Sequence, residues 1–363
     1  MERMTQYKSK AQKEEKKGGF IIVKRLIPVF LFIFIAVVSF GGILNFAKHQ
    51  EELKTQRNNQ AETISIMTDI QSDIIEKLGV IFYEQSGIQI KIIPLDKEAI
   101  VSGKSGSADI YLSSQQNLSF LKKKNKLESY SSENTDTILN LFKDEEAFWT
   151  GLWIDPIIFT VNPGFDSKHP NFEYNWTNIF INDEIKLSLT DFIATEMSED
   201  FLMSLVEHFG NIETFYLLDR GQSHILQYGK YLSTPARMAG MGKCDIGISS
   251  YNEAKRIQRE KIPVLTIYPT DGVPWYLYGV GLSTDSNHPY KAKQFINWLL
   301  SPENYKNIMR ENGYQYIFVN DIEETPDVHG VKLQYWELQK KYDNKGKDKL
   351  LNQWMEKIRF GRN

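Results

Sequence analysis

The chain has 363 residues, of which 41% are hydrophobic and 13% aromatic, so it can form two compact domains and is not a disordered protein. Its only cysteine, Cys244, has no partner in the chain, which excludes an internal disulfide and a cysteine-based metal cluster. The formal net charge of −3 comes from 43 basic and 46 acidic residues that are unevenly spread along the chain.

The N-terminal part is a basic segment followed by an apolar one. Residues 1–25 carry eight Lys or Arg and three Glu, and residues 26–47 carry no charged side chain. Leu26 to Leu44 includes 14 Leu, Ile, Val or Phe residues, which favour bilayer insertion by about 4 to 8 kcal/mol. The run is longer than the apolar part of a secretory signal and lacks an A-x-A-like cleavage site. We therefore expect a retained single-span membrane anchor, with a cleaved signal as the alternative.

The charge distribution orients this anchor. Because Lys and Arg precede the apolar run in excess, residues 1–25 are expected in the cytoplasm and residues 48–363 on the extracellular or periplasmic side of the cell membrane. The outer part then keeps 35 basic and 43 acidic residues, a net charge of −8, which argues against nucleic-acid binding. Residues 48–62 are polar and predict a stalk below a globular body.

From Thr63 the chain alternates between strand and helix patterns. Strands are predicted for "TISIMT" (63–68), "IQIKIIPL" (88–95) and "SADIYLSS" (107–114), with helices following the first and the third. The same order returns in "EIKLSLTD" (184–191), a strand, then "SEDFLMSLVEHFG" (198–210), a helix that Ser198 caps and Gly210 ends, then "KCDIGISS" (243–250), a strand. This alternation predicts an α/β fold with βαβ units and parallel sheets in two lobes.

Two long β-type runs, residues 148–162 and 262–284, are interrupted by Pro and Gly and are expected to cross between the lobes. The predicted division assigns residues 63–160 and 272–363 to lobe 1 and residues 161–271 to lobe 2. The last stretch, residues 328–363, has helical spacing, and we expect it to pack on lobe 1.

The order of these segments resembles the extracellular or periplasmic solute-binding proteins of the type II fold, in the ferric-ion, hexose-phosphate and phosphonate branch. The resemblance rests on "TDIQSDIIEKLGVIFYEQSGIQIKI", "SADIYLSS", "WTGLWIDPIIFTVNP", "CDIGISSYNEAKR", "IYPTDGVPWYLYGVGLST" and "PYKAKQFINWLLSPENYKNIM". It implies two lobes joined by crossing strands, with one small ligand held in the cleft between them and passed to membrane partners.

In the ferric branch of that family, two adjacent tyrosines commonly follow the strand that corresponds to "CDIGIS". Here that place reads Ser249, Ser250, Tyr251 and Asn252, so the tyrosine pair is missing. A hard ferric ion also prefers several anionic oxygens. Ferric iron is therefore kept only as an alternative ligand.

Hydroxyl and acidic residues stand at the predicted strand ends, which is where open α/β sheets bind ligands. They are expected to direct hydroxyls and backbone amides into one cleft, or to cap the helices that follow, and the two roles are compatible. Because Thr234 precedes Pro235, a helix is expected to begin there and to attract an anion. The predicted ligand-binding residues are Thr68, Asp69, Ser113, Ser114, Thr150, Thr190, Asp191, Ser233, Thr234, Ser249, Ser250 and Tyr251.

No motif in the sequence argues for an enzyme. The six His residues form no H-E-x-x-H, and there is no G-x-S-x-G, P-loop or dinucleotide-binding G-x-G-x-x-G. No catalytic residue, metal ligand or cofactor is therefore predicted. We expect a membrane-anchored receptor that captures a small anionic solute, phosphorylated, phosphonate or carboxylate, and presents it to an ABC permease. A sensor histidine kinase is the alternative partner, and a structural surface protein with a degenerate cleft is a third possibility.

Overall fold

The computed structural model describes residues 48, 62–104, 106–320, 326–340 and 344–361. The chain divides into two compact units, residues 1–62 and residues 63–363, and the fold described below is that of the second unit. The predicted cytoplasmic tail, the anchor at 26–47 and the stalk except for its two end residues lie outside the described residues. Within the described ranges, no helix has both the length and the apolar character needed to cross a bilayer.

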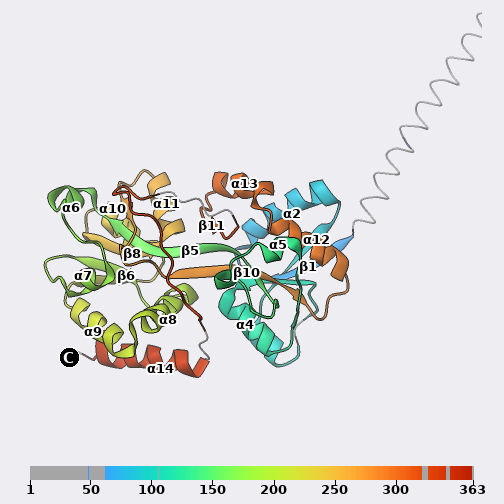
Figure 1. Cartoon of the computed structure of the whole chain (residues 1–363), viewed down its shortest axis with the longest axis horizontal. Helices are drawn as coiled ribbons and strands as arrows, with labels where there is room; N and C mark the ends of the chain where they lie inside the picture. Colours follow the sequence, from blue (N-terminus) through green and yellow to red (C-terminus); the bar gives the residue numbers. More distant parts are fainter. Residues whose placement is uncertain (1–47, 49–61, 105, 321–325, 341–343, 362–363) are drawn as a thin grey trace, which may run out of the picture. The chain divides into compact units, whose positions relative to one another are not determined.

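One path of hydrogen-bonded strands runs through both halves of this unit, in the order β2-β1-β3-β10-β5-β8-β6-β7 (Figure 1). β1 pairs in parallel with β2 and β3, and β6 pairs in parallel with β7 and β8. We call these groups, with their helices, lobe 1 and lobe 2. The strands are β1 (Thr63–Thr68), β2 (Gln89–Pro94), β3 (Ile110–Ser114), β6 (Leu187–Thr190), β7 (Ile225–Gly229) and β8 (Ile246–Ser250). The predicted two-lobed α/β fold is confirmed.

Two long strands cross between the lobes, as the sequence predicted (Figure 1). β5 (Thr150–Val161) pairs with β10 (Trp275–Ser283) as far as Pro156 and with β8 from Ile157 onward. β10 pairs at its other end with β3. All twelve residues of β5 are buried, as expected for the central strand of the path. Short strands complete the sheets: β4 (Leu127–Glu128), β9 (Leu265–Ile267) and β11 (Ile317–Phe318).

Helices cover the sheets of both lobes with apolar faces. α2 buries Ile74, Ile75, Leu78 and Phe82 at helical spacing and ends at Gly87, whose φ of 75° is the left-handed conformation that glycine adopts without strain. The helices of lobe 1 are α2 (Ser72–Ser86), α3 (Lys97–Val101), α4 (Gln115–Lys123), α5 (Glu133–Asp136), the 3₁₀ turn η1 (Asn140–Phe142), α12 (Pro289–Leu299), the 3₁₀ turn η2 (Pro302–Asn304) and α13 (Lys306–Glu311).

In lobe 2 one predicted helix start differs from the structure. α8 begins at Glu196, with Thr195 as its N-cap, and Ser198 is the third helical residue of a capping box with Thr195. Ser198 is therefore not the cap that the sequence predicted, while Gly210 ends the helix as predicted. The helices of lobe 2 are α6 (Pro163–Lys168), α7 (Trp176–Ile181), α8 (Glu196–Phe209), α9 (Asn211–Gly221), α10 (Thr234–Gly240) and α11 (Tyr251–Arg259).

The C-terminal helix packs on lobe 2 and not, as the sequence predicted, on lobe 1. α14 (Asn344–Trp354) continues into one π-helical turn, η3 (Met355–Arg359), and lies beside α8 and α9 (Figure 1). The ring of Trp354 is fully buried, and its centroid lies 5.0 Å from that of Phe192 and 5.6 Å from that of Tyr228. Helical spacing shows that one face of a segment is apolar but not which surface covers it. The other residue limits of the lobes stay a prediction.

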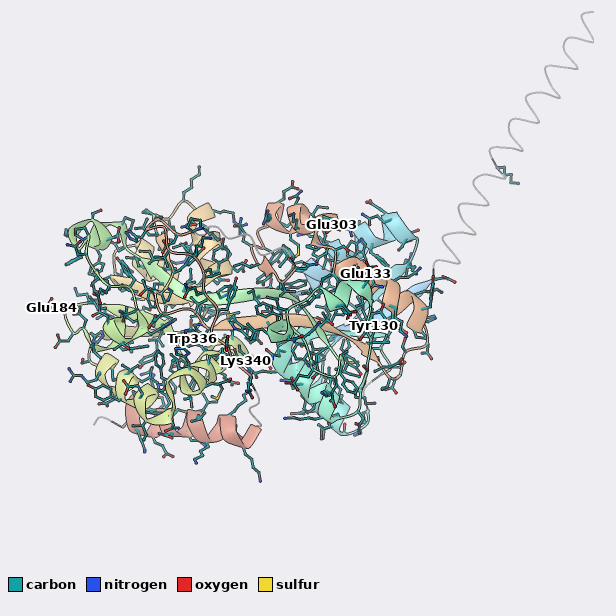
Figure 2. The ribbon with its side chains drawn as sticks, in the orientation of Figure 1. Tyr130, Glu133, Glu184, Glu303, Trp336 and Lys340 are labelled. Carbon is teal, nitrogen blue, oxygen red and sulfur yellow. The ribbon has the colours of Figure 1, made fainter. Side chains whose placement is uncertain are left out.

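Residues 326–340 lead to this helix along lobe 2, and Figure 2 labels two side chains on that stretch. Trp336 stacks on His208 of α8, with ring centroids 3.9 Å apart and planes within 3° of parallel. Its backbone N–H donates to the carbonyl oxygen of Val273 at 2.9 Å. Lys340 forms an ion pair with Asp200 of α8. The C-terminal segment is thus fixed to α8 and to the chain just before β10.

Candidate functional site

The carboxyl ends of β1 and β3 bring an acidic and a hydroxyl side chain together, as the sequence predicted. Ser113 Oγ donates to Asp69 Oδ1 at 2.5 Å. Asn117 Nδ2, from α4, donates to Asp69 Oδ2 at 2.6 Å and to Ser113 Oγ at 2.9 Å. Ser113 and Asn117 are buried, whereas Asp69 keeps an exposed face. This lobe 1 carboxylate is therefore held in one orientation with one side accessible.

A carboxylate from lobe 2 meets this group. Glu196, the first residue of α8, places Oε1 2.7 Å from Lys97 Nζ. Its Oε2 lies 3.4 Å from Asn117 Nδ2 and 3.4 Å from the hydroxyl of Tyr276. All three donors belong to lobe 1 or to the crossing strand β10, so we refer to Lys97, Asn117 and Tyr276 as the lobe 1 donor set. Glu196 thus bonds one lobe to the other.

The crossing strands contribute a third carboxylate. Asp155 of β5 is 2% exposed and accepts a hydrogen bond from the backbone N–H of Asn252 at 2.9 Å, at the start of α11. Burial raises the pKa of Asp155 to about 7, although hydrogen bonds from Asn252 and Ser250 act in the opposite direction. We call Asp69, Ser113, Asn117, Glu196, Asp155, Tyr276 and Tyr278 the lobe junction.

Two tyrosines of β10 line the lobe junction next to these carboxylates. Burial raises the pKa of Tyr276 and of Tyr278 well above its ordinary value, and for Tyr276 the negative charge of Glu196 adds to the effect. Both hydroxyls therefore stay protonated at neutral pH and can donate hydrogen bonds.

The charges at the lobe junction are mainly negative. Desolvation raises the pKa of Asp69, the hydrogen bond from Ser113 lowers it, and the charge of Glu196 raises it further. Lys97 contacts Glu196, and its positive charge lowers the pKa of Asp69. Carboxylates held in this way accept hydrogen bonds from ligand hydroxyls, while Lys97, Asn117 and Tyr276 donate to ligand oxygens.

Lobe 2 contains a small cavity beside the lobe junction. Its volume of about 20 Å³ is enough for about one water molecule. Three of its hydroxyl residues were predicted ligand-binding residues, namely Thr190, Ser249 and Ser250. Ser249 Oγ donates to the carbonyl oxygen of Leu232 at 3.1 Å, which ties β8 to the segment before α10. The cavity is lined by Ile157, Leu189, Thr190, Met197, Ser198, Phe201, Leu232, Ile248, Ser249 and Ser250.

Four of the predicted residues receive hydrogen bonds from nearby backbone amides. Ser114 caps α4 by accepting from Asn117 N at 3.3 Å, and Ser250 caps α11 by accepting from Glu253 N at 3.3 Å. Thr68 accepts from Ile70 N at 3.0 Å, and Asp191 from Ile193 N at 3.2 Å. The capping role that the sequence allowed is present at Ser114 and Ser250, whereas Thr68 and Asp191 stabilise turns, because the N-caps of α2 and α8 are Gln71 and Thr195. Ligand binding by all four residues stays a prediction.

The structure does not bring the side chains of the remaining predicted residues into the lobe junction. α10 begins at Thr234 with Pro235 in its first turn, as predicted, and Ser233 makes no capping hydrogen bond. Anion binding at this helix start stays a prediction. Thr150 pairs with Val280 within lobe 1, five residues before Asp155. The ring of Tyr251 packs in a separate cluster with Tyr268 and Tyr335, although the backbone of Tyr251 bonds the carboxyl of Asp155. These placements arise from tertiary packing, which strand and helix periodicity does not report.

Sequence reasoning missed Lys97, Asn117, Glu196 and Asp155. Asn117 follows the predicted Ser113-Ser114 pair within one helical turn, so its position was a usable signal. Lys97 stands just after the end of β2 and was a second signal of the same kind. Glu196 lies in a loop-to-helix turn that the sequence placed outside the helix, and no local pattern marked it.

Comparison with known proteins identifies the family of this chain. The family model described as bacterial extracellular solute-binding protein matches residues 72–315. The chain belongs to this family. A protein of unassigned function from Haemophilus influenzae is 23% identical to this solute-binding protein over 250 residues, which cover 65% of this chain and 71% of the relative.

Solved structures share the fold of this solute-binding protein at low identity. The periplasmic binding protein AfuA from Actinobacillus pleuropneumoniae, with fructose-6-phosphate bound, has a TM-score of 0.65 at 20% identity, covering 82% of this chain and 99% of that one. The ferric iron-binding protein A of Mannheimia haemolytica has a TM-score of 0.66 at 16% identity, covering 84% and 100%. A Trichodesmium protein in complex with iron and citrate has a TM-score of 0.68 at 16% identity, covering 82% and 99%.

These similarities confirm the predicted family of solute-binding proteins, whose members bind solutes for ABC transporters. At these identities the structural likeness shows the fold alone, so it does not assign the branch or the ligand. Within the described ranges, no three His, Cys, Asp or Glu side chains lie close enough together to hold a metal ion.

Proposed function

We propose that this solute-binding protein captures a small organic anion between its lobes and passes it to an ABC importer. The observation that carries the proposal is the contact of Glu196 with Lys97, Asn117 and Tyr276. These donors come from three elements and converge on one carboxylate, so lobe 1 is already arranged to bind an oxyanion at the lobe junction.

The solute we propose also carries hydroxyl groups. Asp69 is oriented by two donors and keeps an exposed face, so a ligand hydroxyl can donate to it. A phosphorylated or carboxylated sugar-like molecule provides both an oxyanion and hydroxyls, whereas an inorganic anion provides only the first. The fructose-6-phosphate bound by the Actinobacillus pleuropneumoniae protein supports this class as a candidate.

Binding is proposed to stabilise closure of the two lobes. A ligand shifts an open–closed equilibrium only by its difference in affinity for the two states. A solute that contacts both lobes at once binds the closed state better, and the crossing strands β5 and β10 provide the hinge. The apolar run at 26–47 is proposed to hold the protein at the outer face of the cell membrane, beside its permease.

Calorimetry on the full chain in detergent tests the proposal. Hexose phosphates, phosphonates, citrate and ferric iron are titrated separately, and one of the organic anions is expected to bind with saturation at one site. Tyr276→Phe removes one donor to the oxyanion and is expected to weaken that binding about tenfold. Tyr290→Phe is the control, because Tyr290 is 74% exposed. Tight binding of ferric iron without any response to the organic anions would overturn the proposal.

A further inference from the structure

The hydrogen-bond donors that lobe 1 directs at the Glu196 carboxylate are of the kind that would bind the oxyanion of a ligand. Lys97, the first residue of α3, is positioned by Asp96, which caps that helix through Ala99 N at 3.0 Å. Asn117 is 1% exposed and is fixed by Asp69 and Ser113. The amide of Asn117 and the backbone of Lys97 therefore stay in place whether or not Glu196 is bound. When an oxyanion binds to groups that are already ordered, no binding free energy is lost to ordering them.

A second observation concerns the amide of Asn117. Its Nδ2 must face Asp69, Ser113 and Glu196, because each of those oxygens accepts from it. Its Oδ1 is buried and has no hydrogen-bond partner among the described residues. A buried amide oxygen normally receives a donor. A ligand hydroxyl next to the anionic group would supply one.

The Glu196 carboxylate is also easy to displace. The side chains of Lys97 and Glu196 are 43% and 38% exposed, and ion pairs of that exposure contribute little to stability. Asp69 shares Asn117 with Glu196, and two neighbouring carboxylates repel each other. A carboxylate that replaces Glu196 therefore leaves the number of negative charges on the donor set unchanged, whereas a phosphate monoester adds up to about one more.

We propose that the lobe 1 donor set is the oxyanion site of the solute and that Glu196 is an internal competitor for it. Glu196 holds the lobes together at the position that the carboxylate or phosphate group of the solute takes over. The proposal deepens the function proposed above and rests on it, because it names where the anion binds. Only an anion that binds the lobe 1 donor set more strongly than Glu196 does then displaces Glu196.

The two partners of one ion pair are expected to have opposite effects on binding. Glu196→Gln keeps the size of the side chain but weakens the competitor, so the solute binds more tightly, by about two- to fivefold. Lys97→Gln weakens the oxyanion site, so the solute binds less tightly by a similar factor. A purely structural salt bridge would instead change binding in the same direction for both variants, because each variant breaks the same contact.

The experiment is calorimetry on the full chain and its variants with fructose 6-phosphate, inorganic phosphate and citrate as probes. The first and third probes distinguish a phosphate from a carboxylate group, and the second tests whether hydroxyls are needed. Glu213→Gln, an exposed residue of α9, is the control and should bind like the parent chain. Tighter binding with Glu196→Gln and weaker binding with Lys97→Gln supports the proposal.

Two results contradict it in different ways. If an organic anion binds the parent chain but Glu196→Gln leaves its affinity unchanged or lowers it, Glu196 is not a competitor, while the proposed function survives. If none of the probes binds any of the proteins and ferric iron does, both the proposed function and the oxyanion site are wrong. Thermal unfolding of each variant without a probe separates a folding defect from a change in binding.

Discussion

Lys340 Nζ lies 2.5 Å from Asp200 Oδ2, and the two side chains are only 3% and 6% exposed. The same ammonium group donates to the carbonyl oxygen of Trp275 and lies 4.3 Å from the centre of its ring. Lys340 belongs to the C-terminal segment, Asp200 to α8 of lobe 2, and Trp275 begins the crossing strand β10. One buried cation thus joins the C-terminal segment to lobe 2 and to the crossing strand β10.

Lys340→Ala is expected to lower the free energy of unfolding by about 3 to 5 kcal/mol, because it leaves the buried carboxylate of Asp200 without its cation. Gln116 still donates to Asp200 at 2.7 Å, which limits the loss. Urea unfolding measures the effect. Lys349→Ala, on the exposed face of α14, is the control and should change the value by less than about 0.5 kcal/mol. Equal effects of the two variants would show that the pair does not stabilise the fold.

Trp354 fixes α14 to lobe 2. Trp354→Ala removes a fully buried ring from between Phe192 and Tyr228 and is expected to cost about 3 to 5 kcal/mol of stability. The indole N–H of Trp354 has no hydrogen-bond partner among the described residues, so Trp354→Phe loses ring area but no hydrogen bond and should cost less than half as much. Thermal unfolding of both variants checks the order, and a larger loss for Trp354→Phe would contradict it.

Asp155 predicts a pH dependence of stability. The unfolded carboxyl loses its proton near pH 4, whereas in the folded protein the pKa is raised to about 7. Between these values the folded state binds more protons, so Asp155 makes the free energy of unfolding fall as the pH rises from about 4 to about 7. Asp155→Asn has no such proton and should show a smaller fall.

Urea unfolding at about pH 5 and about pH 7.5 compares the two proteins within this window. Both keep Asp109, whose pKa is lowered by its hydrogen bonds despite burial and which therefore acts in the opposite direction at lower pH. The difference between the proteins isolates Asp155. If both lose the same stability between the two pH values, the carboxyl of Asp155 is not the source.

The sequence predicted the helices and strands better than it predicted which side chains of different elements contact each other. Ser113 and Asp69 were predicted together because each stands at the carboxyl end of a strand of one parallel sheet, and strands of that kind end at the same edge. Glu196 and Lys97 are 99 residues apart and meet only because the two lobes pack against each other. No period along the chain encodes such a pair. The same limit explains α14, whose apolar face was visible in the sequence and whose partner was not.

Tyr251 and Ser250 show the limit within a single turn. Ser250 was predicted at the end of β8 and lies there, where it caps α11 and bonds Asp155. Its neighbour Tyr251 begins the helix, and its ring joins Tyr268 and Tyr335 instead. The chain changes from extended to helical backbone between these two residues, so their side chains point in different directions. Residue type and strand position predicted the first placement, while the second depended on the start of the helix.

Gly247 provides a test of how closely α10 packs on β8, beside the small cavity of lobe 2. A Cβ at this position would overlap the carbonyl group of Pro235 and lie 2.7 Å from Thr160 Oγ1, which donates to the carbonyl oxygen of Gly247 at 2.8 Å. Because the obstacle is backbone, Gly247→Ala is expected to cost about 1 to 3 kcal/mol or more of stability. Gly106→Ala is the matched control, since a Cβ there meets nothing within 4 Å, and it should leave stability unchanged or raise it slightly. Denaturant unfolding measures the free energy of unfolding of the two variants. Equal stability of the two would show that α10 can move away from the sheet.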